Sequence, residues 1–205
     1  MSQGVQPADW SSADEVLTAG GVALVPTDTV YGLAVRPDRD DAIDKLFAMK
    51  GRPRNVNLPI MVDSIAAIEG LGAVVDRHAA RLLSSHLVPG SLTVALGVHP
   101  EKLPPWLAGR DEIAVRIPAH DGMLALLGRV GPLLVTSANA HAHATQDEVP
   151  KILADLLAPP DLVIDSGPLG RVASTLVNCN LAQPAVERVG VVPTSEIEEV
   201  LGVHV

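Results

Sequence analysis

The stretch from residue 26 to residue 54 constrains the fold more than any other part of the chain. An apolar run at residues 22–25 has the character of a buried strand, and it leads into small polar side chains at residues 27–29. A helical pattern follows, and it ends in the basic sequence Lys-Gly-Arg-Pro-Arg at residues 50–54. A strand, a hydroxyl-lined turn, a helix and a basic segment together predict a site for a small polar ligand that carries phosphate.

The helix within this stretch has recognisable ends. Asp38 is expected to be its N-cap, and the aspartates at residues 40–41 stand in the first turn, where the helix dipole favours anions. Gly51 is expected to end the helix because glycine adopts the left-handed conformation of a C-terminal cap without strain. Lys50 and Arg52 would then emerge together at the helix end.

The rest of the chain alternates between strand and helix patterns without a strict β-α-β repeat. This alternation predicts an α/β fold with a twisted, mixed parallel and antiparallel sheet flanked by helices, rather than a doubly wound parallel sheet. The length favours a single domain over residues 1–205. The further predicted strands are 30–35, 58–62, 92–96, 113–117, 133–135, 162–164, 174–177 and 185–189, and the further predicted helices are 14–19, 64–71, 76–86, 123–127, 147–157 and the tail from 194.

The composition argues against a dedicated nucleic-acid-binding protein, since the net charge is −9 and aromatic residues, which stack on bases, make up 2%. Cys179 is the single cysteine, so an intramolecular disulfide or a cysteine-based zinc site is excluded, and we expect it to be a small core residue. The first residues lack a signal-peptide pattern, and no run approaches about 18 apolar residues. We therefore expect a soluble, cytoplasmic protein without membrane contact.

The basic segment after the helix has two interpretations. Lys50 and Arg52 can be a solvated helix end that is favoured by the helix dipole. They can equally form a phosphate clamp, in which lysine supplies a point charge and arginine a bidentate fork. The chain contains neither a P-loop nor a dinucleotide-binding glycine motif, so a nucleotide would have to be bound in another way.

Polar side chains within or at the ends of other strands are further candidates. Ser137 and Asn139 follow the apolar run 133–135, and they either cap a turn or bind polar groups at the carboxyl end of a strand. Arg116 stands in an apolar strand, where it faces solvent or is buried with a partner; a buried arginine facing a cleft would suit a carboxylate. Ser174 opens a β-branched run and is either a plain strand start or a hydroxyl in the cleft.

His141 and His143 form a His-x-His pair. Two imidazoles at this spacing can ligate a metal, but zinc sites in proteins use three or four protein ligands. No third ligand stands at a convincing spacing, so we predict no metal held by protein side chains.

Six motifs occur in an order that resembles one known family. They are PTDTVYGL, KGRP, PGSLTVAL, VRIP, TSAN and STLV, and together they resemble the YrdC-type family of threonylcarbamoyl-AMP synthases. The resemblance runs from about Val22 to Val189, and its hallmark is the combination of Lys50 and Arg52 with Ser137 and Asn139. It implies a single YrdC-like domain, of the short form, in which a twisted α/β sheet encloses a central ligand cavity.

The resemblance also implies a reaction and its partners. Members of the family use ATP, L-threonine and bicarbonate or CO2 to make threonylcarbamoyl-AMP and pyrophosphate, with Mg2+ bound mainly through the ATP phosphates. The product serves threonylcarbamoyladenosine modification of tRNA, which implies transient contact with tRNA-threonylcarbamoyl transferase proteins and tRNA.

Site residues carry over by motif. Three departures from the family pattern stand out. Val56 stands where relatives place a nucleotide-contacting asparagine, a role that Asn57 could take instead, and Met61 stands where some relatives carry a substrate-side histidine. The loop after Asn139 reads AHAHAT and lacks the usual Ser-Gly. The resemblance implies that Lys50 and Arg52 are catalytic and hold the ATP phosphates, that Asn139, Thr145 and Arg188 also contact ATP, and that Thr29, Arg116, Ser137 and Ser174 hold threonine.

Two other functions stay open at this point. The same type of domain occurs in carbamoyltransferases that pass through a carbamoyl-adenylate, although those chains carry further domains. A third hypothesis is an RNA- or ribosome-binding module of the same fold that uses the basic segment, although the acidic charge and the scarcity of aromatic residues count against it.

Overall fold

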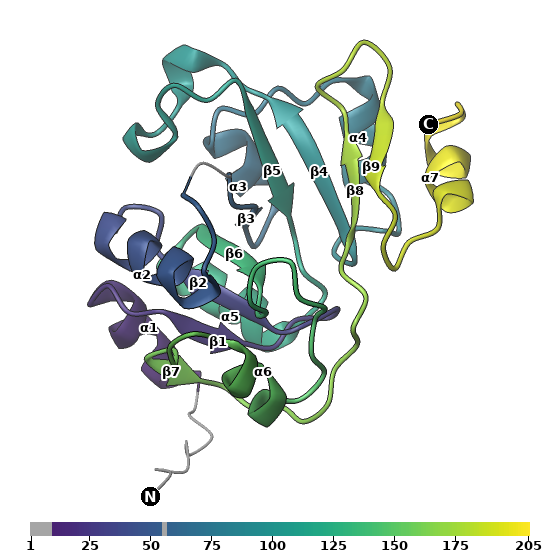
Figure 1. The fold of residues 1–205 in the computed structure, drawn as a ribbon. Coiled ribbons are helices and arrows are strands. Elements are labelled where there is room, and N and C mark those ends of the chain that lie inside the picture. The colour runs from purple at the N-terminus through teal and green to yellow at the C-terminus, as the bar shows by residue number, and fades with distance from the viewer. Residues whose placement is uncertain (1–9, 55–56) are drawn as a thin grey trace, which may run out of the picture.

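A single nine-stranded sheet runs through the computed structural model, which describes residues 10–54 and 57–205 (Figure 1). The strand order across the sheet is β7-β1-β2-β6-β3-β5-β4-β8-β9. The strands are β1 Ala23–Val25, β2 Gly32–Val35, β3 Ile60–Met61, β4 Leu92–Gly97, β5 Glu112–Arg116, β6 Leu133–Ser137, β7 Leu162–Val163, β8 Thr175–Asn178 and β9 Ala185–Arg188.

The sheet is mixed, as the sequence predicted. Strand β1 pairs in parallel with β7, β3 with β5, and β4 with β8, whereas the other neighbouring pairs are antiparallel. Strands β4 and β5 run in a clearly different direction from β1 and β2 in Figure 1, which is the twist expected of a wide sheet. The predicted fold class is therefore confirmed.

Two sets of helices cover the sheet. Helices α1 and α5 pack against one face of the β7-β1-β2-β6-β3 part, and the other helices share the core that forms on the opposite face. The helices are α1 Ser11–Thr18, α2 Asp40–Lys50, α3 Ile65–Gly70, α4 Arg77–Leu83, α5 Asp121–Val130, α6 Val149–Asp155 and α7 Thr194–Leu201.

Alternation along the strands assigns each side chain to one of these two cores. Leu33 and Leu134 belong to the larger core, whereas their neighbours Ala34 and Val135 belong to the smaller one with α1 and α5. This is the period of two that strand geometry imposes. Cys179 lies in the larger core, as expected, and burial raises the pKa of its thiol to about 12.

One predicted helix cap is wrong. Helix α2 begins at Asp40 with Arg39 as its N-cap residue, and the Arg39 side chain makes no capping hydrogen bond. Asp38 instead accepts two hydrogen bonds from the guanidinium of Arg36, at 2.9 and 2.8 Å, so its carboxylate is engaged by a neighbour rather than by the helix. The predicted end is confirmed, because Gly51 has a left-handed φ of 60°.

Several elements differ from their predicted extents, and two strands show how. The strand expected at 58–62 is limited to β3, and the strand expected at 133–135 extends to Ser137 because its backbone pairs with Gly32. The proline-rich segment between β4 and β5 contains two short 3₁₀ helices, Pro100–Lys102 and Pro105–Leu107. In residues 10–54 and 57–205, no helix is long and apolar enough to cross a membrane.

Strand β2, in the interior of the sheet, provides a direct test of the core. Leu33 is fully buried, and Leu33→Ala is expected to cost about 2–5 kcal/mol of unfolding free energy because it removes apolar contacts and leaves a cavity. The matched control is Leu181→Ala at a side chain that is 50% exposed, where the change should stay within about 0.5 kcal/mol. Urea unfolding followed by circular dichroism measures both, and equal losses would contradict the assigned core.

Candidate functional site

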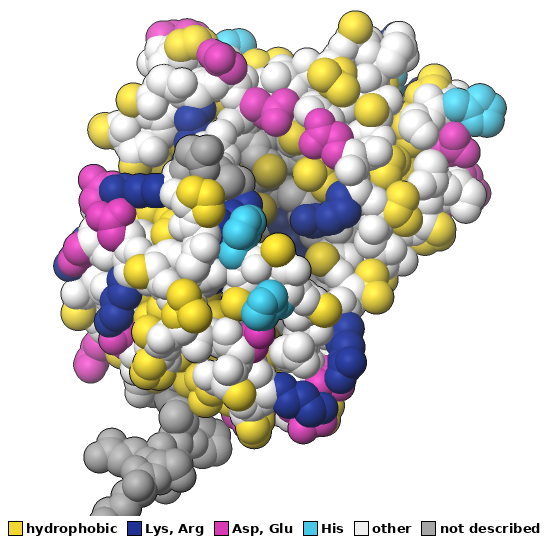
Figure 2. All heavy atoms as spheres, viewed as in Figure 1, with side chains coloured by type: hydrophobic (Ala, Val, Ile, Leu, Met, Phe, Trp, Pro, Cys, Tyr) yellow, Lys and Arg dark blue, Asp and Glu magenta, His cyan; other side chains and the backbone are white. Residues whose placement is uncertain are grey.

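A cavity of about 330 Å³ opens over the middle of the sheet, on the face that α1 and α5 cover elsewhere. Figure 2 shows a hollow near the centre of the molecule, with Lys and Arg side chains at its border. Most of the lining side chains are small, apolar or hydroxylated. The polar ones are Thr27, Thr29, Arg52, Asn57, Thr93, Arg116, Thr136, Ser137, Ser174 and Arg188.

Strand alternation explains why several of these side chains share one face. Ala114 and Arg116 are two apart on β5, and both line the cavity. Met61 on β3 is the register partner of Arg116, and Thr93 on β4 is that of Leu176 on β8. Four neighbouring strands therefore present one residue or more to the same space.

The turn after β1 contributes two threonines with different roles. Thr27 is buried, and its hydroxyl donates to the backbone oxygen of Val30 at 2.6 Å, which holds the turn in shape. Thr29 Oγ1 lies 3.1 Å from Thr27 Oγ1 and accepts a hydrogen bond from Arg116 at 2.9 Å. Thr29, a predicted threonine-binding residue, thus lines the cavity beside Arg116.

Arg116 is 5% exposed and is held by three partners. Its guanidinium donates to Thr29 Oγ1, to the backbone oxygen of Gly90 at 3.0 Å and to Asp28 Oδ1 at 2.7 Å. Burial lowers the pKa of Arg116, and the charge of Asp28 opposes that shift. Three of its five N–H groups are used within the described part of the chain, which leaves donors for a ligand carboxylate.

Asp28 is a site residue that the sequence analysis did not single out. Its carboxylate is nearly buried, pairs with Arg116 and also accepts a hydrogen bond from the Ser91 hydroxyl at 3.1 Å. The available signal was a carboxylate in a turn of small polar residues together with an arginine in an apolar strand. A charged side chain that is buried needs a partner of the opposite charge, so these two signals together would have indicated that Asp28 pairs with Arg116.

Lys50 lies behind the cavity rather than on its lining. The residue is 3% exposed, and its ammonium group donates to the backbone oxygens of Ser137 and Asn139, which ties the end of α2 to the end of β6. Burial, with a smaller contribution from the charge of Arg52, lowers the pKa of Lys50 to about 8. Lys50 of the KGRP motif therefore holds the backbone of Ser137 and Asn139, in the TSAN motif, in place.

Ser137 and Asn139 are bonded to each other. The Ser137 hydroxyl donates to Asn139 Oδ1 at 2.6 Å and lines the cavity. The Asn139 amide donates to the backbone oxygens of Ala140 and His143, so this side chain shapes the loop after β6. Asn139 is close to the cavity residues but is not part of the lining.

Two arginines complete the charged border of the cavity. Arg52 lines it, and its buried Nε has no hydrogen-bond partner among the described residues, a state that proteins rarely leave uncompensated. Arg188 donates to the backbone oxygen of Ser174 at 3.0 Å and lies 3.3 Å from its hydroxyl. Ser174 is buried, and its hydroxyl is 2.7 Å from that of Thr93.

The remaining predicted residues lie apart from this group or cannot be described. Thr145 is outside the lining, where its hydroxyl donates to the backbone oxygen of Arg171, so its contact with ATP stays a prediction. Val56 lies outside the described residues. Met61 lines the cavity with an apolar side chain.

The histidine pair gives no sign of a metal centre in the described part of the chain. His143 lies 2.6 Å from Asp155, which also accepts a hydrogen bond from the backbone N–H of Ala140. Among residues 10–54 and 57–205, no group of three or more His, Cys, Asp or Glu side chains is placed to hold a metal ion. The chemistry of the cavity is that of arginines and hydroxyls, which suits a ligand with carboxylate or phosphate groups.

Comparisons with known proteins place this geometry in context. Residues 15–190 match the Sua5/YciO/YrdC family, whose description is "Telomere recombination". A protein of Bacillus subtilis named threonylcarbamoyl-AMP synthase is 32% identical over 199 residues, covering 95% of this chain and 57% of that protein. A protein of Mycobacterium tuberculosis named putative threonylcarbamoyl-AMP synthase is 33% identical over 195 residues, covering 94% of this chain and 88% of its own length.

Solved structures share the fold. Sua5 of P. abyssi, in a crystal structure with L-threonine, has a TM-score of 0.84 and 30% identity over 94% of this chain and 57% of that one. YciO of E. coli has a TM-score of 0.80 and 27% identity over 94% of this chain and 97% of that one. Full-length HypF, at 20% identity and a TM-score of 0.76, shares the fold alone.

The buried ion pair of the site leads to a stability prediction. Asp28→Ala leaves Arg116 buried without its counter-charge, so it is expected to cost about 3–5 kcal/mol of unfolding free energy. Asp38→Ala is the matched control, because it breaks the ion pair of Asp38 with Arg36, whose side chains are 50% and 28% exposed, respectively. Such an exposed pair contributes about 1 kcal/mol or less. Urea unfolding distinguishes the two, and a loss at Asp28 no larger than at Asp38 would show that Arg116 does not depend on this carboxylate.

Proposed function

The chain belongs to the Sua5/YciO/YrdC family, and from this premise we propose that it makes threonylcarbamoyl-AMP and pyrophosphate from L-threonine, bicarbonate or CO2, and ATP. The family predicted from the sequence motifs is confirmed, and its curated relatives are named as enzymes that make this adenylate. The chain spans 57% of the length of the Bacillus relative and 88% of that of the Mycobacterium relative. We therefore propose the activity of these relatives for this chain and test it below.

The observation that carries the proposal is the convergence of three arginines on one hydroxyl-lined cavity. Arg52, Arg116 and Arg188 all border it, and Arg52 has a buried donor without a partner in the described chain. A substrate set with one carboxylate and a chain of phosphates supplies the anions that such a site needs.

Threonine has a natural place at the Arg116 end. The unused N–H groups of Arg116 would hold its carboxylate, and the hydroxyls of Thr29, Ser137 and Ser174 would orient its amine and hydroxyl. The crystal structure of the P. abyssi relative contains L-threonine, which supports a threonine site in this family.

The reaction then needs positioning more than it needs a strong base. The threonine amine adds to CO2 and loses a proton to give a carbamate, and a carbamate oxygen attacks the α-phosphorus of ATP. The bond from that phosphorus to the bridging oxygen breaks, and pyrophosphate leaves. Holding two anions in line can contribute about 7–11 kcal/mol in well-oriented systems.

Cations offset the charge that builds up on the phosphates. Arg52 and Arg188 would contact them directly, Lys50 would act from behind the strand end, and Asn139 and Thr145 would complete the nucleotide side. Mg2+ would enter with ATP and be held by phosphate oxygens and water, which is how this ion is usually bound beside nucleotides. It would supply further neutralisation of the phosphate charge.

The fate of the product defines the proposed partners. Threonylcarbamoyl-AMP is a reactive mixed anhydride, and we propose that residues 1–205 act as one domain that passes it to tRNA-threonylcarbamoyl transferase proteins by transient contact. Since the final acceptor is tRNA, the cytoplasm is the proposed compartment.

Pyrophosphate release tests the function. We expect release to require ATP, L-threonine and bicarbonate together, with the adenylate seen by mass spectrometry. Arg52→Met and Lys50→Met are each expected to lower kcat/KM about 100-fold or more, because Arg52→Met removes a cation that lines the cavity and Lys50→Met removes the one behind it. Lys151→Met, at an exposed pair with Asp147 and Glu148, is the control and should keep full turnover.

Two outcomes would contradict the proposal. Normal turnover in both variants, with unfolding curves like that of the original chain, would remove Lys50 and Arg52 from the reaction. Release that ignores threonine but requires carbamoyl phosphate would favour the carbamoyl-adenylate reaction instead.

The pKa of Lys50 predicts a pH dependence. With a pKa of about 8, Lys50 is cationic below that pH and becomes neutral above it, so kcat/KM for ATP should fall as the pH rises through 8. The expected slope is about tenfold per pH unit well above the pKa. Lys50→Arg keeps the charge at all these values, so it should abolish the fall whatever its absolute rate; an unchanged profile would assign the fall to another group.

A further inference from the structure

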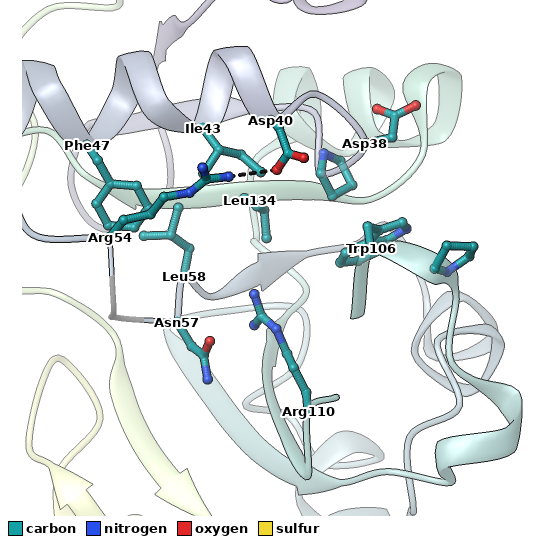
Figure 3. Close-up of a pocket in the computed structure, with 12 residues that line it drawn as sticks. Asp38, Asp40, Ile43, Phe47, Arg54, Asn57, Leu58, Trp106, Arg110 and Leu134 are labelled. Carbon is teal, nitrogen blue, oxygen red and sulfur yellow. Dashed lines mark hydrogen bonds and ion pairs between the residues drawn. The ribbon is translucent and has the colours of Figure 1, made fainter. Parts of the chain in front are cut away.

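A second and larger cavity, of about 520 Å³, lies on the opposite face of the sheet. It is enclosed by α2, by the segment after β4 that contains Trp106, and by Leu134 of β6 (Figure 3). Leu134 and Val135 are consecutive residues, yet Leu134 lines the second cavity and Val135 the first. The strand therefore separates the two spaces.

The second cavity gathers aromatic side chains in a chain that has few. The sequence has two tryptophans, one tyrosine and one phenylalanine, and both Trp106 and the single phenylalanine, Phe47, line this cavity. Ile43, Leu58 and Leu134 add aliphatic surface between them (Figure 3). Such walls are typical of a site for an apolar, flat ligand body.

The charged side chain of Arg110 points into this apolar space. Figure 3 shows the Arg110 side chain reaching from below into the cavity, toward Leu58 and Leu134. Its guanidinium has no hydrogen-bond or ion-pair partner among the described residues, and burial lowers its pKa. A half-buried arginine without a counter-charge favours an incoming anion.

The acidic border limits how much negative charge the ligand can carry. Asp38 and Asp40 line the cavity, and both carboxylates are already paired, with Arg36 and Arg54 respectively. Arg54 also pairs with Asp44, so it has no charge to spare for a ligand. Arg110 is then the one lining cation among the described residues that is left for a ligand, so its charge matches a single carboxylate and cannot offset a polyphosphate.

We propose that this second cavity binds a small aromatic monocarboxylate, with the ring between Trp106 and Phe47 and the carboxylate on Arg110. The site is independent of the threonine and ATP cavity, because it lies on the other face of the sheet and uses none of the arginines there. Asn57 is the one described residue that lines both cavities, so a ligand here would be close to the active cavity without entering it.

Three probes with the same ring test the proposal: naphthylacetate, naphthylacetamide and naphthyl phosphate. Titration calorimetry and saturation-transfer NMR on the full chain should show naphthylacetate binding with a dissociation constant of about 1 mM or below, the range expected for a ligand of this size. The neutral amide and the dianionic phosphate should each bind more weakly. Saturating L-threonine and ATP should not displace naphthylacetate.

Variants identify the place of binding. Arg110→Met should weaken naphthylacetate about tenfold or more and leave the amide unchanged, because only the charged contact is lost. Ile43→Trp, which fills the cavity, should remove both. Arg171→Met, at an exposed pair with Asp147, is the matched control and should bind like the original chain.

The results that overturn the proposal are equally definite. Acid and amide of equal affinity, or an Arg110→Met chain that binds the acid as before, would show that Arg110 is not the anion partner. Displacement by threonine or ATP would place the probe in the first cavity. A phosphate that binds more tightly than the carboxylate would mean that the acidic border does not select monoanions.

Discussion

The buried guanidinium of Arg116 is the interaction on which the candidate site depends. It joins three segments that are far apart in the chain: strand β5, the turn that carries Asp28 and Thr29, and the backbone at Gly90. A buried ion pair is weak evidence for stability, since an apolar replacement of similar volume is often as stable. What the pair does supply is a cation fixed at one position with N–H groups still available, which is what recognition of a carboxylate needs.

Lys50 plays a related part at the other side of the cavity. Its ammonium group holds two backbone oxygens at the end of β6, and this contact brings the end of α2 to the loop that begins at Ser137. Arg52 follows two residues later, so the same contact positions it at the edge of the cavity. A change at Lys50 would therefore act in two ways, by removing a charge and by loosening the strand end.

Local pattern in the sequence was enough to predict most elements and the residue types at their ends. The left-handed glycine after α2, the mixed sheet and the placement of Thr29, Ser137 and Ser174 in one cavity all follow from such patterns, together with the resemblance of the motifs. The partner of Arg116 could not be predicted in this way, because Asp28 is 88 residues away in the chain. The prediction of Asp38 as a helix cap was wrong for a similar reason, because its carboxylate binds the side chain of Arg36 and not the helix backbone.

The two cavities show how one sheet can carry two kinds of binding surface. Consecutive residues of a strand face opposite sides, so β6 contributes Val135 to a cavity of arginines and hydroxyls and Leu134 to a cavity of aromatic and aliphatic side chains. The first is suited to a crowded set of anions, and the second to one anion on an apolar body. Asn57 is the described residue that lines both cavities, so it is the most direct route by which a ligand in one could influence the other.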